Sequence, residues 1–548
     1  MMRSLVLLAS TSAVAGVATA QPPTYSVAAT PRNTVDGRLF GAFLEKASWG
    51  GEYGADAAVD PATGEIRPGV LERLEWMEIP LIRFPGGTAI DYYPWWRLVD
   101  SFPGEHATRP RNAHYKPEEV GRPGITSSDG SLGLHEFIAL CEHLDAEPLL
   151  VVNLGVAYRG ELPADEAAQR YGADFVRYCN AAAGPMAELR AANGHPEPFN
   201  VRHWQIGNET WGFEGLGEGE RTDSALAVLA TAETAYLEAM HAADTSIQLI
   251  VDGAQRLGEG AVAEAGHLVD YLTYHQYDPW GVGAVRRGGD TLREGQVSAE
   301  EVWRAVVAVP GTDSLTGLSR MRDYALDSTD GPLAMTEWNL NGWFAGEAKF
   351  AEPDAKLLAF GLGAGSYLNA MLRASDRVRL ACQSMLVGVS WAITSIRVDT
   401  TGEHPPTMHP TGLATGLYAR EHGDRYHEHA VAGGRYYPQP LELGTQGPSA
   451  RVAEQDVAFT ADDEYFYAHV LNRAYTGEQL IRIRLPVDVQ PAYTHFVLSD
   501  RVGGELSRYA AIEELRLGEP AGAPVTEVEV ALPPRSLSVV KFARAATD

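Results

Sequence analysis

The chain has few cysteines, and none of them lies in a C-x-x-C pair. Only Cys141, Cys179 and Cys382 occur among 548 residues. An odd number leaves at least one thiol free unless it pairs between chains, and a large core does not need a disulfide framework. We therefore expect most of these cysteines to be buried structural side chains.

The chain also has little basic charge. Its 44 Lys and Arg residues face 72 Asp and Glu residues, which gives a formal net charge of −28. Nucleic acids are bound through basic surfaces, so a nucleic acid is not an expected partner. An anionic membrane surface is not expected either. This charge is typical of a soluble protein with an acidic surface, and a neutral substrate fits it best.

Long apolar runs are absent beyond the first twenty residues, where about 20 continuous apolar residues would be needed to span a membrane. The N-terminus itself has the pattern of an export signal. Arg3 precedes an apolar stretch from Leu5 to Val17, and Ala18-Thr19-Ala20 gives a small-x-small cleavage pattern. We expect residues 1–20 to be a signal peptide and the mature protein to be secreted or periplasmic.

The order of apolar segments predicts a large α/β domain. Between about residues 36 and 415, eight short apolar runs alternate with helix-like segments, which is the pattern of a (β/α)₈ barrel. The runs are residues 39–44, 79–82, 148–152, 203–208, 247–251, 269–274, 332–336 and about 385–393. Helical spacing marks residues 132–144, 164–179, 224–243 and 355–372, and Ser298 to Glu301 has the form of a capping box.

The pattern changes after about residue 415. Apolar residues then alternate with period two, as at 481, 483 and 485 and again at 528, 530 and 532, and no long helix is evident. This alternation is typical of an antiparallel β-sandwich. Residues 24–29 are expected to add a strand to it. The predicted organisation is a barrel over residues 36–415 and a β-sandwich domain from residues 21–35 and 416–548.

Polar and charged residues stand where the apolar runs of the barrel end. Glu45, Arg83, Glu209, His275 and Glu337 each follow such a run. Ordinary turns would account for one or two of them, but not for the whole set. In (β/α)₈ barrels the C-terminal ends of the strands form the active site, so we expect these side chains to meet there.

Two carboxylates at one barrel mouth indicate glycoside hydrolysis. One acid protonates the leaving oxygen and the other must be ionised, and the charge of one raises the pKa of the other. Asn208, next to Glu209, can bond a sugar hydroxyl, while Arg83 and Tyr277 can keep Glu337 ionised. Tryptophan faces suit the C–H faces of sugars, and we expect one or two of four to contact ligand: Trp211, Trp280, Trp338 and Trp343.

Several ordered motifs carry a resemblance to a known family. They are Phe40-Gly41-Ala42-Phe43-Leu44-Glu45, Ile82-Arg83-Phe84-Pro85-Gly86-Gly87, residues 146–155, Ile206-Gly207-Asn208-Glu209, Tyr274-His275-Gln276-Tyr277, Thr336-Glu337-Trp338-Asn339 and residues 532–540. With these motifs the chain resembles the α-L-arabinofuranosidases of glycoside hydrolase family 51, in the retaining clan A. The resemblance implies that Glu337 is the nucleophile, that Glu209 is the acid/base, and that no cofactor is needed.

Two positions depart from the family pattern at the sugar pocket. Thr88 stands where an asparagine is usual after the second strand, and Met385 stands where a glutamine is expected on the eighth, with Gln383 two residues earlier. The chemistry of the clan does not depend on these positions. The identity of the sugar does, so another exo-glycosidase or an endo-β-glycanase is an alternative.

The sequence therefore predicts a secreted retaining glycoside hydrolase, an exo-acting α-L-arabinofuranosidase on plant or algal polysaccharide. A non-catalytic carbohydrate-binding barrel is the alternative from another class. No spacing of histidines or cysteines fits a metal site, and a homo-oligomer is left open. The residues expected to bind substrate are Glu45, Arg83, Thr88, Asn208, His275, Tyr277, Trp280 and Trp338.

Overall fold

The computed structural model describes most of the chain. The described residues are 21–46, 52–60, 62–109, 118–119, 126–127, 132–217, 219–309, 331–353, 355–500, 506–519 and 522–545. The predicted signal peptide lies outside them. Within these ranges no helix combines the length and the apolar character that crossing a membrane requires.

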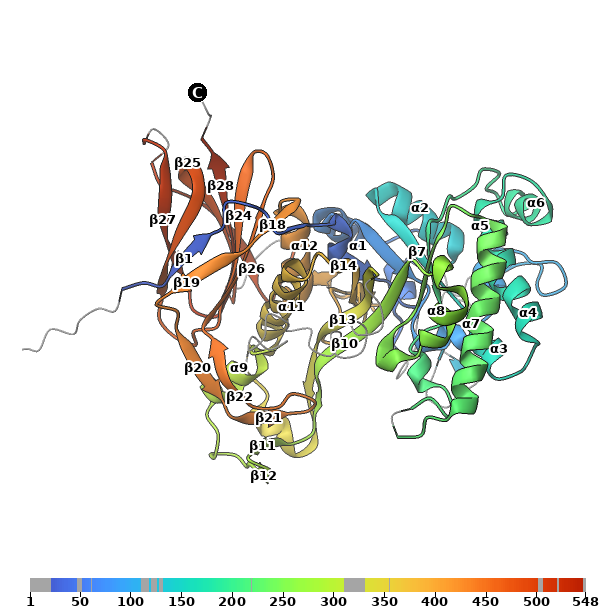
Figure 1. The fold of residues 1–548 in the computed structure, drawn as a ribbon, viewed down its shortest axis with the longest axis horizontal. Helices are drawn as coiled ribbons and strands as arrows, with labels where there is room; N and C mark the ends of the chain where they lie inside the picture. The colour runs from blue at the N-terminus through green and yellow to red at the C-terminus, as the bar shows by residue number, and fades with distance from the viewer. Residues whose placement is uncertain are drawn as a thin grey trace, which may run out of the picture.

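A closed barrel of eight parallel strands forms the centre of the larger domain (Figure 1). The strands follow one another around the barrel in chain order, and β14 closes it by pairing with β3. They are β3 (Gly41–Phe43), β4 (Leu81–Phe84), β7 (Glu147–Val152), β8 (His203–Ile206), β9 (Gln248–Asp252), β10 (Tyr271–Val282), β13 (Leu333–Phe344) and β14 (Val378–Ser384). The predicted barrel is thus confirmed, and seven of its strands include or overlap the predicted runs.

The eighth strand was predicted in the wrong place. The strand is Val378–Ser384, whereas residues 385–393 follow it, and only Val387–Gly388 forms a short strand, β15, outside the barrel. The strand was missed because Arg379 and Gln383 interrupt its apolar residues. Both side chains find polar partners outside the barrel, Arg379 on Thr34 and Gln383 on Thr411.

Helices cover the outside of the barrel, apart from α9, which lies beyond it beside α11 (Figure 1). They are α1 (Pro68–Met77), α2 (Leu134–Leu144), α3 (Gly155–Tyr158), α4 (Ala164–Ala167), α5 (Asp174–Asn180), α6 (Pro185–Ala192), α7 (Asp223–Ala243), α8 (Glu259–Ala265), α9 (Ala299–Val306), α11 (Lys356–Arg373) and α12 (Pro410–Arg420). The capping box is present at α9, where Ser298 and Glu301 exchange hydrogen bonds of 3.2 and 2.9 Å. The run predicted at 164–179 is α4 and α5 joined by a π-helical segment, Ala168–Ala173.

The C-terminal region forms a mainly antiparallel sheet. Its strands are β1 (Thr24–Val27), β2 (Asn33–Thr34), β18 (Arg425–His427), β19 (His429–Ala432), β23 (Gln455–Ala461), β24 (Tyr465–Asn472), β25 (Gln479–Ser499), β26 (Ala511–Leu517), β27 (Val525–Leu532) and β28 (Ser536–Arg544). The first part of β25 pairs with β1 and β27, and its second part pairs with β26 and β28. The sheet thus folds over a core that includes Phe459, Ile481 and Phe542.

The border between the two regions is less sharp than the sequence predicted. The predicted boundary at residues 415 and 416 falls inside α12. Within the predicted sandwich, β20 (Tyr436–Gln439) pairs with β22 (Ser449–Ala453), while β21 (Leu441–Leu443) pairs with β11 (Val285–Arg287), which follows β10 and also pairs with β12 (Asp290–Thr291). These short strands were not predicted from the sequence, and their pairing depends on contacts between segments far apart in the chain.

A buried ion cluster joins the barrel helices to the C-terminal sheet. α11 and α12 lie between the barrel and the sheet (Figure 1). Asp456 on β23 is 2.8 Å from Arg373 of α11 and 3.3 Å from Arg473, which also donates to Ser366 at 2.9 Å. Asp456 is buried, and although burial opposes its ionisation, the two arginines lower its pKa to about 2.

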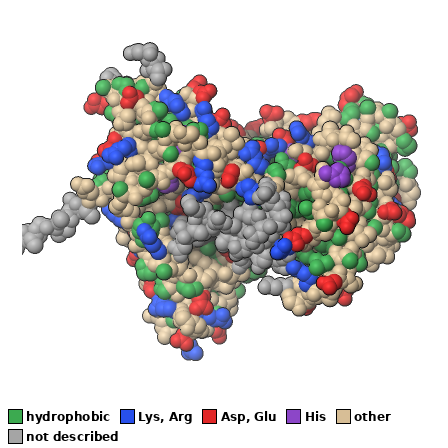
Figure 2. All heavy atoms as spheres, viewed as in Figure 1, with side chains coloured by type: hydrophobic (Ala, Val, Ile, Leu, Met, Phe, Trp, Pro, Cys, Tyr) green, Lys and Arg blue, Asp and Glu red, His purple; other side chains and the backbone are tan. Residues whose placement is uncertain are grey.

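Apolar side chains fill the barrel toward the N-terminal ends of its strands, and polar side chains lie toward the C-terminal ends. Leu81, Leu149, Ile250 and Leu380 belong to one buried cluster inside the strands. This packing leaves the C-terminal ends of the strands for the polar residues. On the outer surface, acidic and basic side chains lie interspersed over the face shown in Figure 2.

Candidate active site

The two glutamates singled out in the sequence meet at the C-terminal end of the barrel. Glu209 follows β8, and Glu337 lies within β13. Three atoms lie within 4.8 Å of one another: one carboxylate oxygen of Glu209, one of Glu337, and a ring nitrogen of His275. Retaining glycosidases hold their carboxyl groups about 5–5.5 Å apart, and inverting ones about 6.5–9.5 Å apart. The separation therefore suits retention.

Glu337 is held in its ionised form. Arg83 Nη1 donates to its Oε1 at 2.8 Å, and the Tyr277 hydroxyl donates to its Oε2 at 2.7 Å, so both contacts expected from the sequence are present. The carboxylate is buried, and burial alone would raise its pKa. The charges of His275 and Arg83 and the hydrogen bond from Tyr277 outweigh burial and lower the pKa of Glu337 below its ordinary value.

Glu209 has the opposite protonation tendency. Burial raises its pKa, and the negative charges of Glu337 and Asp252 raise it further, although a hydrogen bond with His275 opposes them. His275 Nδ1 lies 3.1 Å from Glu209 Oε1, and its Nε2 lies 2.9 Å from the Thr336 hydroxyl. The two carboxyl groups thus have pKa values displaced in opposite directions, which is the pattern of an acid paired with a nucleophile.

Arg83 orients a third side chain of the site. Its Nη2 donates to Asn208 Oδ1 at 2.6 Å, and its Nε donates to Gln205 Oε1 at 2.9 Å. Asn208 Nδ2 is buried and has no hydrogen-bond partner among the described residues. Gln205 was missed by sequence reasoning because it lies inside the apolar run of β8. The alternation of strand residues was the available signal, since Gln205 and Arg83 both point into the barrel.

Two aspartates hold the backbone around Glu209. Asp91 Oδ2 accepts the N–H of Asn208 at 3.0 Å, and Asp252 Oδ2 accepts the N–H of Thr210 at 2.8 Å. Sequence reasoning missed both aspartates. Asp91 lies in the 3-10 turn Thr88–Tyr92 after β4, where nothing in the local sequence distinguishes it from a turn residue.

Glu45 lies beside Glu337 across a glycine. Gly87 N–H lies 3.3 Å from Glu45 Oε1. A Cβ atom added at Gly87 would lie 3.0 Å from Glu45 Oε1 and 3.3 Å from Glu337 Oε1, so a side chain there would crowd both carboxylates. Thr88 follows at the start of the next turn and is partly exposed.

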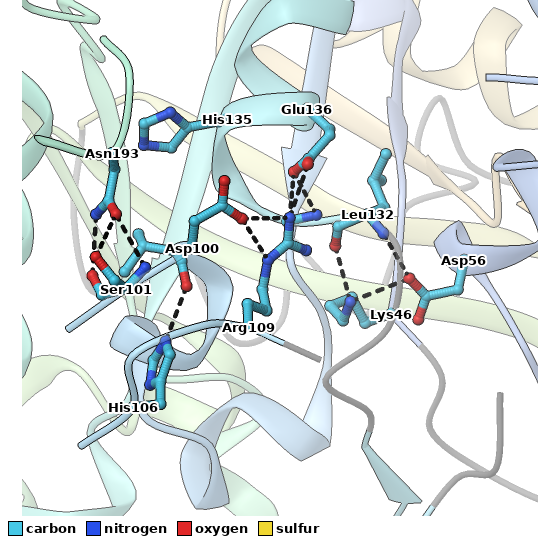
Figure 3. Close-up of polar contacts among 12 residues, drawn as sticks. Lys46, Asp56, Asp100, Ser101, His106, Arg109, Leu132, His135, Glu136 and Asn193 are labelled. Atoms are coloured by element: carbon cyan, nitrogen blue, oxygen red, sulfur yellow. Dashed lines mark hydrogen bonds and ion pairs between the residues drawn. The ribbon is translucent and has the colours of Figure 1, made fainter. Parts of the chain in front are cut away.

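A buried polar network supports the segment after Glu45 (Figure 3). Lys46 Nζ donates to the carbonyl of Leu132 at 2.8 Å and pairs with Asp56 at 3.2 Å, and Asp56 accepts the N–H of Leu132 at 2.9 Å. Close by, Arg109 bridges Asp100 and Glu136 at 3.2 and 2.7 Å. These contacts attach the end of β3 and the chain after β4 to the start of α2.

The four tryptophans divide into exposed and buried ones. Trp211, Trp280 and Trp343 are 40%, 48% and 43% exposed, and the ring centroid of Trp280 is 5.4 Å from Tyr277 and 5.2 Å from Trp343. The prediction that Trp338 contacts substrate is wrong. Its ring is fully buried and packs on Tyr367 of α11, because alternation along β13 turns it away from the barrel interior.

The eighth strand brings Ser384 to the site, whereas the sequence indicated Met385 or Gln383. Gln383 is fully buried and bonds Thr411 and Ser395 outside the barrel, at 2.7 and 3.0 Å. Met385 is also buried. Ser384 hydrogen-bonds the hydroxyl of Tyr277, which in turn contacts Glu337, so Ser384 is the polar residue of β14 that reaches this cluster.

A groove of about 640 Å³ lies next to the turn that carries Glu209. It is lined by Tyr92, Tyr158, Arg159, Gly212, Phe213, Glu214 and Val228. The N–H of Gly212 donates to the carbonyl of Glu209 at 2.7 Å, so the groove begins one turn beyond that residue. The rings of Tyr158 and Phe213 lie 4.7 Å apart, and Arg159 lies 4.3 Å from the Tyr92 ring centroid.

Glu209, His275 and Glu337 also have the composition of a small metal site, since they are three side chains of ligand type at short range. The surroundings argue against that use. Both oxygens of Glu337 already accept hydrogen bonds from Arg83 and Tyr277. A fixed guanidinium at 2.8 Å would repel a second cation, so the arrangement fits acid–base and nucleophilic chemistry better.

Comparison with known proteins finds similarity to α-L-arabinofuranosidases. A family model described as "Alpha-L-arabinofuranosidase 1 domain" matches residues 73–287. "Probable alpha-L-arabinofuranosidase C" of Aspergillus terreus is 26% identical over 392 residues, which cover 67% of this chain and 70% of that protein. "Intracellular exo-alpha-(1->5)-L-arabinofuranosidase 1" of Bacillus subtilis is 27% identical over 411 residues, covering 70% and 73%.

Solved structures show the same fold. An α-L-arabinofuranosidase from Thermotoga maritima, solved in complex with arabinose, superposes with a TM-score of 0.68 at 22% identity and covers 95% of this chain and 99% of that one. A family 51 α-L-arabinofuranosidase from Bifidobacterium longum also gives 0.68, at 20% identity, with 95% and 100% covered.

Proposed function

We propose that this glycoside hydrolase, a relative of the family 51 α-L-arabinofuranosidases, removes terminal α-L-arabinofuranosyl groups by double displacement. Glu337 is the nucleophile and Glu209 is the acid/base. One observation carries the assignment: an ionised Glu337, held by Arg83 and Tyr277, has an oxygen within 4.8 Å of one from Glu209, whose pKa is raised. This is the arrangement that retention requires.

In the first step an oxygen of Glu337 attacks the anomeric carbon of the sugar. The bond from that carbon to the leaving oxygen breaks, and Glu209 gives its proton to that oxygen. The sugar is then esterified to Glu337, and Glu209 is ionised. Glu337 loses its negative charge as the new bond forms, and the hydrogen bonds from Tyr277 and Arg83 position its oxygens for attack.

In the second step Glu209 acts as a base. Its carboxylate takes a proton from water, the water oxygen attacks the anomeric carbon, and the ester bond to Glu337 breaks. His275 Nδ1 lies 3.1 Å from Glu209 and 3.6 Å from Glu337. Burial lowers the pKa of His275, but the two carboxylates raise it above its ordinary value, so its proton stabilises whichever glutamate is ionised.

The sugar specificity rests on the relatives and on the polar groups around the pair. Curated relatives that align over about two thirds of this chain are named α-L-arabinofuranosidases. The amide of Asn208 has an unpartnered donor, and Glu45 lies beside Gly87, so both can bond sugar hydroxyls. A terminal furanosyl group would be bound between them and Glu337.

Features next to the pair support a polysaccharide as the natural substrate, and we propose that it comes from plants or algae. Trp280 and Trp343 form an exposed aromatic pair that continues from Tyr277. The groove beside Gly212 adds aromatic rings on the side of Glu209, where the leaving group departs. Aromatic faces of this kind stack on sugar rings.

A second candidate function keeps the chemistry and changes the sugar. Thr88 and Met385 differ from the expected family residues, and the polar side chain that β14 supplies is Ser384. These differences favour another exo-glycosidase or an endo-β-glycanase as the alternative. A non-catalytic binding barrel is less consistent with the site, because both carboxyl groups and their supporting residues are in place.

A panel of nitrophenyl glycosides and polysaccharides tests the proposal. We expect the α-L-arabinofuranoside to be cleaved well above the other glycosides, with free arabinose of retained configuration as the first product. Preference for another glycoside would favour the second candidate. Binding without hydrolysis over a long incubation would show a binding protein instead.

Export is part of the proposal and rests on the first twenty residues. The pattern of Arg3, the apolar stretch and Ala18-Thr19-Ala20 is that of a cleaved signal peptide. Expression of the full chain in a bacterium, followed by N-terminal sequencing, tests it. A mature protein that begins at Gln21 in the periplasm or medium is expected, and uncleaved protein in the cytoplasm would contradict it.

A further inference from the structure

The acid/base residue has an unusual backbone conformation. Glu209 has φ 46° and ψ 52°, which is the left-handed region that side chains other than glycine and asparagine rarely adopt. Gly207, two residues earlier, is also left-handed with φ 71°. Such a conformation persists only where surrounding contacts impose it, and it is common at functional sites.

The imposing contacts come from two buried aspartates, one on each side of Glu209. Asp91 accepts the N–H of Asn208 at 3.0 Å, and Asp252 accepts both the N–H and the hydroxyl of Thr210, at 2.8 and 3.0 Å. Asp91 therefore fixes the peptide unit between Gly207 and Asn208, and Asp252 fixes the one between Glu209 and Thr210. Asp91 and Asp252 are only 1% and 4% exposed.

Each aspartate is itself attached to a different part of the barrel mouth. Asp91 Oδ1 accepts the N–H groups of Leu154 and Gly155, just after β7, at 2.9 and 3.0 Å. Asp252 ends β9, and its Oδ1 accepts the N–H of Ala254 at 2.9 Å. Each carboxylate uses both oxygens as acceptors, so the turn that carries Glu209 is connected to the strands on both sides of β8.

We propose that Asp91 and Asp252 are positioning residues that clamp the backbone around Glu209 and so aim its carboxyl group at the leaving oxygen. Neither touches the catalytic pair through an observed hydrogen bond; both act through the peptide units of Asn208 and Thr210. The inference deepens the proposed function, since it assumes that Glu209 is the general acid.

The two aspartates have different electrostatic effects on Glu209. The groups that face Glu209 are His275 from β10, Glu337 from β13 and Asp252 from β9, and the negative charge of Asp252 helps to raise the pKa of Glu209. Asp252 in turn is close to Glu233 of α7, a buried carboxyl whose pKa is raised by burial and by Asp252. Asp91 is not among the groups that shift the pKa of Glu209 most, and burial raises its own pKa to about 6.

The test compares substrates that differ in their need for an acid. A dinitrophenyl arabinofuranoside has a leaving group that departs without protonation, whereas an alkyl arabinofuranoside needs a proton. In Asp91→Asn and in Asp252→Asn an amide N–H₂ replaces one of the two acceptor oxygens, with little change of shape. We expect kcat/KM to fall at least about tenfold for the alkyl substrate and to stay within about twofold for the dinitrophenyl one.

The pH dependence of kcat/KM distinguishes the effect of Asp91 from that of Asp252. Asp252→Asn removes a negative charge that raises the pKa of Glu209, so the alkaline limb of kcat/KM should move to lower pH. Asp91→Asn should move that limb less than Asp252→Asn does, because Asp91 acts mainly through the backbone. Equal losses on both substrates with unshifted limbs would show a merely structural role and overturn the proposal, and so would the absence of any loss.

Asp270→Asn is the matched control. Asp270 also accepts a strand N–H, that of Leu249 at 2.9 Å, but at the opposite end of β9 and β10. It should change neither the leaving-group ratio nor the pH limbs. If Asp252→Asn does not fold, Thr210→Val removes only the hydroxyl contact with Asp252 and should still lower the rate on the alkyl substrate selectively.

The wild-type protein is measured first on both arabinofuranosides. If it cleaves neither, the proposed sugar is wrong, and the same comparison is made with the glycoside that the substrate panel selects. A selective loss on poor leaving groups then still supports the clamp, and a parallel loss still overturns it. Failure of the sugar assignment and failure of the positioning role are thus distinguishable.

Discussion

The Tyr277 hydroxyl donates a hydrogen bond of 2.7 Å to Glu337 Oε2, the oxygen that Arg83 leaves free. Tyr277 is partly buried, and its desolvation together with the charge of Glu337 raises its own pKa far above the ordinary value, so it remains a donor at any working pH. The two side chains come from neighbouring strands, β10 and β13, which pair in parallel.

Tyr277→Phe should lower activity by removing this bond. A hydrogen bond to a charged group contributes about 1.5–3 kcal/mol, which corresponds to a loss of about tenfold to a hundredfold in kcat/KM. Because the bond lowers the pKa of Glu337, its loss should also move the acidic limb of the profile to higher pH. Tyr436→Phe, at an exposed tyrosine of β20, is the control and should leave both quantities unchanged. A rate equal to that of the wild type would contradict the arrangement.

Glu337→Ala should abolish turnover, because no oxygen is left to form the glycosyl-enzyme bond. Azide added with an activated aryl glycoside should restore part of the rate and give a glycosyl azide of inverted configuration. Steady-state kinetics and product analysis by NMR measure the two effects. An Ala variant that retains near wild-type rate without azide would remove Glu337 from its role.

The pH dependence of kcat/KM should be bell-shaped and wide. Glu337 must be ionised, so activity is lost as pH falls through its pKa, which lies below the ordinary value. Glu209 must be protonated, so activity is lost as pH rises through its pKa, which lies above the ordinary value. The two limbs belong to the coupled pair. Replacing Glu209 with Gln should eliminate the alkaline limb for an aryl glycoside that the variant still cleaves slowly, and a limb that persists would assign it to another group.

Asp456→Ala should destabilise the protein without entering the active site. It leaves Arg373 and the fully buried Arg473 without their shared counter-charge, and breaking a buried pair costs about 3–5 kcal/mol. Thermal unfolding at neutral pH measures the loss. Asp463→Ala is the control, because its side chain is 94% exposed and an exposed pair contributes about 0–1 kcal/mol. Equal melting temperatures for the two variants would contradict this account.

The same aspartate predicts how stability depends on acid. The pKa of Asp456 is about 2 in the folded protein and 3.8 ordinarily, so its stabilising effect is complete above the unfolded value. It is lost as pH falls from about 4 to about 2, and it amounts to roughly 2 kcal/mol. In Asp456→Ala this part of the acid sensitivity should be missing. An unchanged slope of unfolding free energy against pH would show that other carboxyl groups dominate.

Seven barrel strands could be predicted because a parallel strand covered on both sides is apolar throughout. β14 broke that rule, since Arg379 and Gln383 find polar partners outside the barrel. The same limit explains the error at Trp338. A strand end shows that a residue is near the mouth, but only the pleat of β13 shows that Trp338 points toward Tyr367.

The sequence by itself determined the barrel, the strand ends and the residues that meet there. An apolar run that ends in Glu209 or Glu337 places a carboxyl group at the mouth whatever the loops do, because the C-terminal ends of all parallel strands lie on one side. Only the tertiary structure decided how those groups are charged and aimed. Asp91 reaches Asn208 across 117 positions of sequence, and burial of Glu209 close to Glu337 sets their pKa values. Such effects depend on distance in space and on the exclusion of water, and neither can be read from the order of residues.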